Sequence, residues 1–367
     1  MVSRPTLTVV VCCHNGATKL PIALTSLSRQ TLEPDRFEVL VVDDGSSDGT
    51  AGVAAEMGAR TLRLLSNAGL AASRNAGVAA ARGEIVAFTD DDCEADPMWL
   101  ATVLSAFERD RTIDGVGGRV VPQSANGFVR RFLSTNNPLL PLGSELLRSA
   151  RLDFRLRLYI RRALQGHGAP PTTLYSVVGA NMAFRRRLIV ELGGFDEQFR
   201  FGSEEEELCL RAHRRAGGAR LLYLPDAVVT HWFDERVGDS IRRSRAYGRG
   251  VARRFLKHRD TRPIAYPVPA LIATLLLAGV VGRRARLLIF AALAPAGAYP
   301  RWLAAVRRLR SAEPLVYPYL QLAQEAATMI GELDGLRRGY EPVPSRHLSL
   351  TLTETAQPEL LEAAPAG

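Results

Sequence analysis

The first 110 residues alternate between two patterns of hydrophobic and polar positions. Strands are predicted for the short apolar runs, rich in β-branched residues, at residues 7–13, 37–42, 62–65 and 85–88. Helices are predicted for the longer segments between them, at residues 19–30, 50–57 and 70–81. This alternation is typical of a doubly wound, mostly parallel sheet with helices on its faces. We therefore expect an α/β fold here.

The pattern loosens between residues 126 and 171, where arginines interleave with leucines and aromatic residues. That stretch could form an amphipathic helix lying on lipid, or an ordinary exposed helix whose arginine stems cover apolar surface. Regular structure then resumes, and we expect strands at residues 175–184 and 221–224 with helices at residues 186–192 and 204–216.

Two apolar runs follow, at residues 264–282 and 287–306, with a basic connector between them. Each is close to the roughly 20 residues that a helix needs to cross a bilayer. A helical membrane hairpin is favoured over a re-entrant or in-plane anchor, and a soluble helical bundle is the alternative. The chain thus divides into a catalytic domain at residues 1–235, a basic juxtamembrane linker at 236–262, a membrane-associated hairpin at 263–310, a helical segment at 311–341 and a flexible tail at 342–367.

The net charge of +9 could indicate nucleic acid, a membrane surface or an anionic substrate. Much of the charge lies in residues 241–262, directly before the most apolar part of the chain, which is a juxtamembrane pattern. Aromatic residues are sparse there, so we expect no nucleic-acid partner. The four cysteines lack the spacing of a disulfide framework or a zinc site, and the N-terminus lacks a signal-peptide pattern. We expect the catalytic domain at the cytoplasmic face of the cell membrane.

Three consecutive carboxylates, Asp90, Asp91 and Asp92, follow the apolar strand at residues 84–88. Burying such a cluster without partners would be very costly. Hard divalent cations such as Mg²⁺ or Mn²⁺ prefer oxygen ligands, and phosphates often complete their coordination. Taken alone, the pattern indicates either a metal and nucleotide-diphosphate site or a solvated acidic turn, and its context decides between them.

Other polar residues follow the predicted strands. Asn15 comes after the first strand, and Asp43 and Asp44 come after the second. In doubly wound sheets the ligand lies beyond the carboxyl ends of the strands, where these side chains would meet Asp90. Asp43 could accept hydrogen bonds from a base or ribose, or could only end its strand with an Asx turn.

Arg74 lies on the predicted helix at residues 70–81, on the same face as Leu70 and Val78. A charge on such an apolar face needs a partner. A diphosphate would suit a guanidinium, and an internal salt bridge to a strand-end aspartate is the alternative.

Four consecutive glutamates begin the predicted helix at residues 204–216. Ser203 and Glu206 have the spacing of a capping box. The four carboxylates also repel one another, which raises the proton affinity of at least one and suits a general base.

Taken together, seven motifs occur in the order and spacing that resemble the family 2 glycosyltransferases, across about residues 6–235. They are VVVCCHNG, VVDDGSSDGT, NAGLAASRNAG, FTDDDC, VVGANMAFRR, GGFDEQF and EEEELCLRAHRRAG. The resemblance implies the nucleotide-diphospho-sugar transferase fold, called A-type, and a divalent metal cofactor.

The resemblance also implies roles for single residues. Asp43 would contact the nucleotide base, Asp90 the ribose or a metal-bound water, and Asp92 the metal, with Asp91 at the variable middle position. His231 matches a further metal ligand in some relatives, although a lone histidine is as often structural. By register Glu205 takes the place of a catalytic aspartate, one methylene longer, with Glu204 as its substitute. Donor-binding candidates in the matching motifs are Asn15, Asp44, Asn75 and Asn181.

The sequence is therefore interpreted as a metal-dependent enzyme that transfers a sugar, with inversion, from a nucleotide-diphospho-sugar to a lipid-linked or cell-envelope glycan acceptor. A nucleotidyltransferase is a rival, but it would need a glycine-rich loop with a basic residue after the first strand, where residues 13–17 read CHNGA. A membrane-associated scaffold with a vestigial site is the other alternative.

Overall fold

The computed structural model of the chain describes residues 4–123, 127–140, 142–143, 151–165, 173–234, 236–263, 266–341 and 346–349. The predicted tail at residues 342–367 lies largely outside these residues, as does part of the loosely patterned segment at 126–171.

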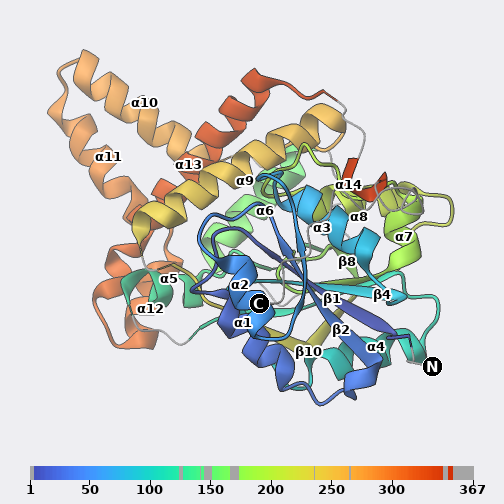
Figure 1. Cartoon of the computed structure of the whole chain (residues 1–367). Coiled ribbons are helices and arrows are strands. Elements are labelled where there is room, and N and C mark those ends of the chain that lie inside the picture. Colours follow the sequence, from blue (N-terminus) through green and yellow to red (C-terminus); the bar gives the residue numbers. More distant parts are fainter. Residues whose placement is uncertain are drawn as a thin grey trace.

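The described part of the chain is built around an eight-stranded sheet with the order β3-β2-β1-β4-β9-β6-β10-β5 (Figure 1). Its strands are β1 Leu7–Cys13, β2 Phe37–Asp43, β3 Arg60–Arg63, β4 Ile85–Asp90, β5 Cys93–Ala95, β6 Gly115–Pro122, β9 Met182–Arg185 and β10 Leu221–His231. The pairs that join β3, β2, β1 and β4 are parallel, as is the pair of β6 and β10. Strands β9 and β5 run antiparallel to their neighbours. The expected α/β fold with a mostly parallel sheet is confirmed.

Strand β1 shows why the sheet has two apolar faces. All seven of its residues are buried. Because successive side chains point to opposite faces of a strand, Val9 and Val11 enter one core and Val10 enters the other. A strand buried on both faces reads as a continuous apolar run, which is the pattern that predicted it.

Helices cover both faces. One core is shared with α1 Leu20–Ser28, α2 Thr50–Glu56 and α4 Trp99–Arg109. The opposite core is shared with α3 Leu70–Ala80, α7 Arg186–Glu191 and α8 Glu204–Arg214. This arrangement brings the loops after β1, β2 and β4, and the beginnings of α3 and α8, to the carboxyl edge of the sheet.

Several boundaries differ from the prediction. Strand β3 begins two residues before the expected run at 62–65, and β10 extends well beyond 221–224. The expected strand at residues 175–184 is two short strands, β8 Leu174–Ser176 and β9. Strand β8 pairs with β7 Leu142–Gly143 in a separate sheet, and a turn closed by the bridge between Val178 and Asn181 separates it from β9.

A second layer of helices follows the sheet domain. It contains α5 Phe128–Thr135, α6 Leu152–Gln165, α9 Val237–Lys257, α10 Pro267–Val281, α11 Ala285–Ala298, α12 Arg301–Leu309 and α13 Tyr317–Arg338. The short α14 Arg346–Ser349 packs against α3 of the sheet domain instead. Helices α10 and α11 form a hairpin that extends away from the sheet (Figure 1). A separate aromatic core at the base of this layer contains Phe132, Trp302 and Tyr317.

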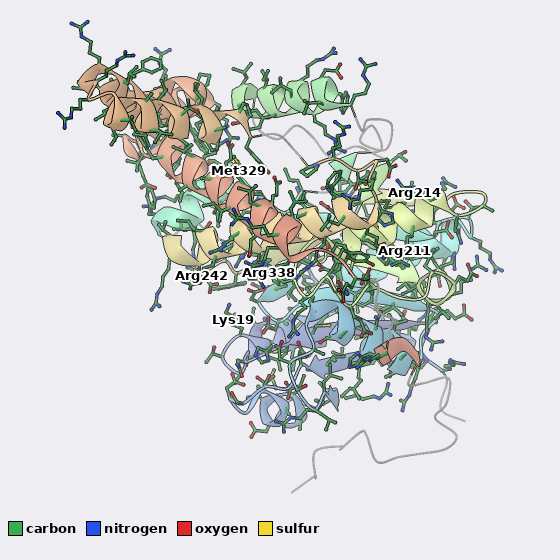
Figure 2. The ribbon with its side chains drawn as sticks, turned by 90° about the horizontal axis from the view of Figure 1, so that it is seen from above. Lys19, Arg211, Arg214, Arg242, Met329 and Arg338 are labelled. Atoms are coloured by element: carbon green, nitrogen blue, oxygen red, sulfur yellow. The ribbon has the colours of Figure 1, made fainter. Side chains whose placement is uncertain are left out.

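Helices α9 and α13 pack closely along their length (Figure 2). Glycines allow the approach: a Cβ atom on Gly248 would lie 2.0 Å from the carbonyl oxygen of Thr328, and one on Gly331 would lie 2.0 Å from that of Arg245. The basic residues of α9 also have partners. Ion pairs join Arg243 to Asp234, Arg245 and Arg249 to Asp334, Arg254 to Glu206, and Lys257 to both Asp196 and Glu207.

Among the described residues, no single helix has both the length and the apolar composition for a membrane crossing. The consecutive helices α11 and α12 meet the criteria together, but they are bent by 63° at their junction. The predicted membrane hairpin at residues 263–310 stays a prediction.

The glycine contact between α9 and α13 can be tested by adding one methyl group. The Gly331→Ala variant should be destabilised by about 1–3 kcal/mol, because the new methyl meets backbone rather than a flexible side chain. The matched control is Gly52→Ala on α2, whose Cβ would meet nothing within 4 Å and which should be stabilised slightly. The measurement is chemical denaturation of the full chain, and equal stability of the two variants would contradict the packing argument.

Candidate functional site

A cavity of about 470 Å³ opens at the carboxyl edge of the sheet. The loops after β1, β2 and β4 form part of its wall, and the beginnings of α3 and α8 form another part. Among the residues predicted from sequence, those that line it are Asp44, Arg74, Asp90, Asp91, Asp92, Glu204, Glu205 and His231. The structure therefore brings together side chains from positions 44 to 231.

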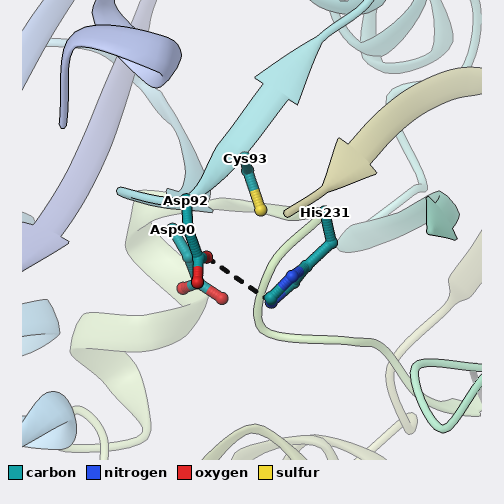
Figure 3. A group of neighbouring side chains, drawn as sticks. All are labelled: Asp90, Asp92, Cys93 and His231. Carbon is teal, nitrogen blue, oxygen red and sulfur yellow. Dashed lines mark ion pairs between the residues drawn. The ribbon is translucent and has the colours of Figure 1, made fainter. Parts of the chain in front are cut away.

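Asp90, Asp92, Cys93 and His231 form a tight cluster at one end of the cavity (Figure 3). One potential ligand atom from each lies within 4.8 Å of the others. His231 is the last residue of β10, and its Nε2 atom lies 3.5 Å from Asp92 Oδ1. Strand β10 pairs with β5, which begins directly after Asp92, and this pairing sets His231 beside the carboxylates.

The electrostatics of this cluster fit a divalent cation. Burial raises the pKa of Asp90 and of Asp92, and burial together with the charge of Asp92 raises the pKa of Asp91 to about 7. Burial lowers the pKa of His231 to about 4, so its imidazole is neutral, and its Nδ1 atom has no hydrogen-bond partner among the described residues. A neutral imidazole and two carboxylates are suitable ligands for Mn²⁺. Burial raises the pKa of the Cys93 thiol, which therefore stays protonated and is a poor ligand.

Arg74 lies at the centre of the cavity wall with only 2% of its surface exposed. Its Nη1 atom donates a hydrogen bond of 2.5 Å to Glu204 Oε1, and its Nη2 atom lies 3.8 Å from Asp90 Oδ1. A Cβ atom on Gly179 would lie 2.4 Å from Nη2, so the guanidinium needs a glycine there. The alternative of an internal salt bridge to a strand-end aspartate is thus partly realised, but the closer partner is a glutamate on α8.

Glu205 faces the cavity from the first turn of α8. Burial and the neighbouring charge of Glu204 raise the pKa of Glu205 to about 8, and its Oε2 atom has no hydrogen-bond partner among the described residues. A carboxylate with raised proton affinity and a free oxygen can accept a proton from a bound hydroxyl.

The predicted capping box at the start of α8 is wrong. Ser203 has a left-handed backbone with φ of 67°, and its side chain makes no capping hydrogen bond. Glu206 forms an ion pair with Arg254 of α9 instead of turning back to Ser203. The next glutamate, Glu207, forms ion pairs with Arg211, Lys257 and His258.

Hydrogen bonds join the loops after β1 and β2 at the rim of the cavity. Asp44 lines the cavity, and its two carboxylate oxygens accept hydrogen bonds from the N–H groups of Ala68 and Gly69. Asp43 is buried behind the lining, where Oδ1 accepts a hydrogen bond from the Ser46 N–H and Oδ2 accepts none from the described residues. Asn15 joins the two loops through Ser46 and Ser47 and lies outside the lining.

Two further predicted donor-binding residues, besides Asn15 and Asp43, do not line the cavity. Asn75 binds both the N–H and the carbonyl of Phe195 through its side-chain amide. Asn181 accepts a hydrogen bond from the Trp99 indole and donates to the carbonyl of Ala227. Both amides lie within the fold, where their hydrogen bonds hold neighbouring segments in place.

The sequence analysis did not identify several residues of the cavity. Tyr247 of α9 lines it and stacks on Phe201, with ring centroids 5.6 Å apart. Arg200 and Arg243 also line it. The nitrogen of Lys19 lies 3.5 Å from Asp92 Oδ2. Tyr247 and Arg243 come from the segment predicted as a linker, and Arg200 comes from a segment with no predicted element. Only the fold brings them to the carboxyl edge.

Comparison with known proteins shows that the sequence matches the model of a known family. The model of the family described as "Glycosyl transferase family 2" matches residues 8–193, which include β2, β4 and the cluster members Asp90, Asp92 and Cys93, whereas His231 lies beyond the match.

Individual relatives agree. The chain is 32% identical over 293 residues to the pre-mycofactocin glycosyltransferase of Mycobacterium tuberculosis, an alignment that covers 78% of this chain and 56% of the relative. It is 27% identical over 237 residues to the glucosyl-dolichyl phosphate glucuronosyltransferase of Haloferax volcanii, covering 61% and 68%. The chain thus spans only about half the length of the first of these relatives.

Among solved structures, the mannosyltransferase PcManGT of Pyrobaculum calidifontis, in complex with GDP-Man and Mn²⁺, has the same fold. The TM-score is 0.55 at 21% identity, and the match covers 91% of this chain and 87% of that one.

The Asp90 cluster predicts a change in stability that depends on metal. Mn²⁺ should raise the melting temperature of the full chain by several degrees, because a ligand of the native state stabilises it by mass action. The Asp92→Asn variant should lose most of this rise, yet melt no lower than the wild type in EDTA, since it removes a buried charge. The matched control is Asp35→Asn, which changes an exposed aspartate. An undiminished Mn²⁺ response in Asp92→Asn would contradict the assignment.

Proposed function

Because the chain belongs to glycosyl transferase family 2, we propose that it transfers a sugar from a nucleotide-diphospho-sugar to an acceptor hydroxyl in a metal-dependent reaction. The observation that carries the proposal is a single cavity whose wall combines a set of metal-ligating side chains, a buried guanidinium and a carboxylate with raised proton affinity. These are the groups that a sugar transfer with a diphosphate leaving group requires.

Asp90, Asp92 and His231 would hold the divalent metal, which supplies charge neutralisation for the departing diphosphate. Arg74 lies beside Asp90 and can donate hydrogen bonds to phosphate oxygens if it exchanges one of its carboxylate contacts. Asp43 remains our candidate for the nucleotide base, since its Oδ2 atom accepts no hydrogen bond from the described residues, although Arg63 Nε lies 3.5 Å from it.

Glu205 would remove the proton from the acceptor hydroxyl. The acceptor oxygen forms the new bond to the anomeric carbon as the bond from that carbon to the diphosphate breaks. The proton passes to the carboxylate of Glu205. Attack from the side opposite the leaving group inverts the anomeric centre. The raised pKa of Glu205 suits this role, because a base is most effective with a pKa near the working pH.

A lipid-linked or cell-envelope acceptor, at the cytoplasmic face of the membrane, is supported by exposed apolar surface. On the α10–α11 hairpin Leu277 is 65% exposed and Phe290 is 58% exposed. Helix α6 has an outer stripe of exposed apolar residues at four-residue spacing, formed by Leu152, Leu156, Ile160 and Leu164. In Figure 2, α6 (green) and the hairpin (orange) lie along the same outer edge of the molecule.

This surface favours contact with lipid through apolar side chains. Many basic residues of α9 have carboxylate partners within the protein, which leaves less of its charge for anionic lipid. The name of the Haloferax relative refers to a lipid phosphate substrate, which is consistent with the proposal.

The base assignment predicts activity that depends on pH and on Glu205. Since the pKa of Glu205 is raised to about 8, the carboxylate is charged only above this pH, and the kcat/KM of transfer should fall about tenfold per unit as the pH drops below about 8. Glu205→Gln should lower kcat about 10²- to 10⁴-fold while leaving the Mn²⁺ stabilisation intact. Glu205→Asp, which restores the shorter side chain, should keep more activity than Glu205→Gln.

The measurement is turnover and binding across UDP-, GDP-, dTDP- and CDP-sugars with Mn²⁺. Equal activity of Glu205→Gln and the wild type would remove Glu205 as the base. If none of the donors binds or is turned over, the proposed function is refuted and the scaffold alternative is favoured.

The membrane proposal predicts that a charge on the hairpin weakens binding to vesicles. Leu277→Glu should reduce co-flotation with anionic phospholipid vesicles at least tenfold, because a carboxylate in the apolar layer is costly. Leu65→Glu is the matched control, since Leu65 is 79% exposed on the sheet domain. Equal flotation of the two variants would argue against insertion of the hairpin.

A further inference from the structure

A second cavity of about 330 Å³ adjoins the first. The two share Val178, Glu205 and Tyr247 in their walls, so the proposed base faces both. The remainder of the second cavity lies between the sheet domain and the helical layer, with lining residues from α6, α9, α12 and α13. Its volume suits a head group about the size of a monosaccharide, at the lower end of the range of ligand pockets.

Two buried arginines line this cavity. Arg155 of α6 is 7% exposed and Arg254 of α9 is 6% exposed. Burial lowers the pKa of both guanidiniums, and the charge of Arg254 lowers the pKa of Arg155 further. Arg254 forms an ion pair with Glu206, yet its Nε atom is buried without a hydrogen-bond partner among the described residues. Buried donors of this kind are normally satisfied, so an unpaired one indicates a missing acceptor.

Among the described residues, the glutamates of the cavity leave the charge of Arg254 only partly compensated. Glu325 already accepts hydrogen bonds from Tyr159, Tyr299 and Gln321. Burial raises the pKa of Glu332 to about 7 and that of Glu205 to about 8, so at neutral pH Glu205 is mostly protonated and Glu332 is about half protonated. A guanidinium stays charged under the same conditions. The cavity is therefore prepared for an anion.

The orientation of α6 supports this interpretation. Its inward face carries Arg155, Tyr159 and Ala163 at four-residue spacing, while leucine and isoleucine side chains face outward. An arginine on the inward face of a helix with an apolar outer face is the reverse of the usual arrangement in a soluble protein. The Arg155 guanidinium therefore lies in the wall of the second cavity, where it can contact a bound group.

We propose that the second cavity binds the acceptor and recognises an anionic group on it, a carboxylate or a phosphate, through Arg155 and Arg254. The acceptor hydroxyl then reaches Glu205 at the wall shared with the donor cavity. This inference rests on the proposed function, because it takes Glu205 as the base. The anionic group could belong to a soluble sugar acid or sugar phosphate, or to the phosphate of a lipid-linked acceptor.

The test measures binding of four probes to the full chain by calorimetry: glucose, glucuronate, glucose 6-phosphate and dodecyl phosphate below its micelle concentration. EDTA is present so that no probe can bind through a metal ion in the donor cavity. At least one anionic probe should bind, and glucose at least tenfold more weakly. Binding of glucuronate or glucose 6-phosphate would identify a soluble type of acceptor. Binding of dodecyl phosphate alone would identify a lipid-linked phosphate.

Matched variants locate the binding. Arg155→Gln should weaken the binding of the tightest-binding anionic probe at least tenfold, since a charge-assisted contact is lost. Arg157→Gln, two residues along α6, should leave it unchanged, because Arg157 is exposed and pairs with Asp153. Arg254→Gln should also weaken binding. If that variant fails to fold because Glu206 loses its partner, Arg155→Gln alone decides.

Three outcomes would overturn the inference: equal binding of glucose and glucose 6-phosphate, unchanged binding in Arg155→Gln, or no binding of any anionic probe. Donor turnover and the Mn²⁺ response of the same preparation are measured in parallel. If they persist while probe binding fails, the acceptor inference falls and the proposed function stands. If they fail as well, the proposed function falls first.

Discussion

The crowding of carboxylates at the end of β4 is the constraint on which the site depends. Asp90, Asp91 and Asp92 lie close to Glu204 and Glu205 in a largely buried region, and such a concentration of negative charge requires positive charge close by. Arg74 supplies part of it from within the fold. The structure around it is fitted to this arrangement, since Gly179 leaves room for the guanidinium and Gly16 leaves room for the carboxylate of Asp91.

The second organising feature is the attachment of the basic helix α9 to α8, the helix that carries Glu205. Glu206 pairs with Arg254, and the fully buried Glu207 binds Lys257 and His258 just beyond it. Burial opposes the charge of Glu207, yet its cationic partners lower its pKa to about 2. A carboxylate with a lowered pKa stabilises the fold above the unfolded pKa and loses that contribution as the pH falls toward about 2. The contact between the two helices is therefore firm throughout the neutral range.

Local pattern was sufficient for the parallel half of the sheet and for the cluster at its edge. Strands β1, β2 and β4 are buried on both faces, so their apolar runs are visible in the sequence, and the topology then forces Asp44 and Asp90 to the same edge. The hydrogen bonds of Asn75 and Asn181 could not be predicted, because Phe195, Trp99 and Ala227 are distant in the sequence. The basic run at residues 241–262 was visible, but its partners Glu206, Asp196 and Asp334 were not. The second cavity depends on four helices that only the fold assembles.

The close packing of α9 against α13 has a mechanical consequence. Glycines bring the two helix backbones into contact, and ion pairs join α9 to the helix that carries Glu205. Helix α13 in turn contacts the α10–α11 hairpin. A continuous set of helix contacts thus joins the hairpin to the helix of Glu205, whereas Asp92 lies between two strands of the sheet, β4 and β5. The distance between Glu205 and the metal-ligating cluster therefore depends on the packing of the outer helices as well as on the sheet.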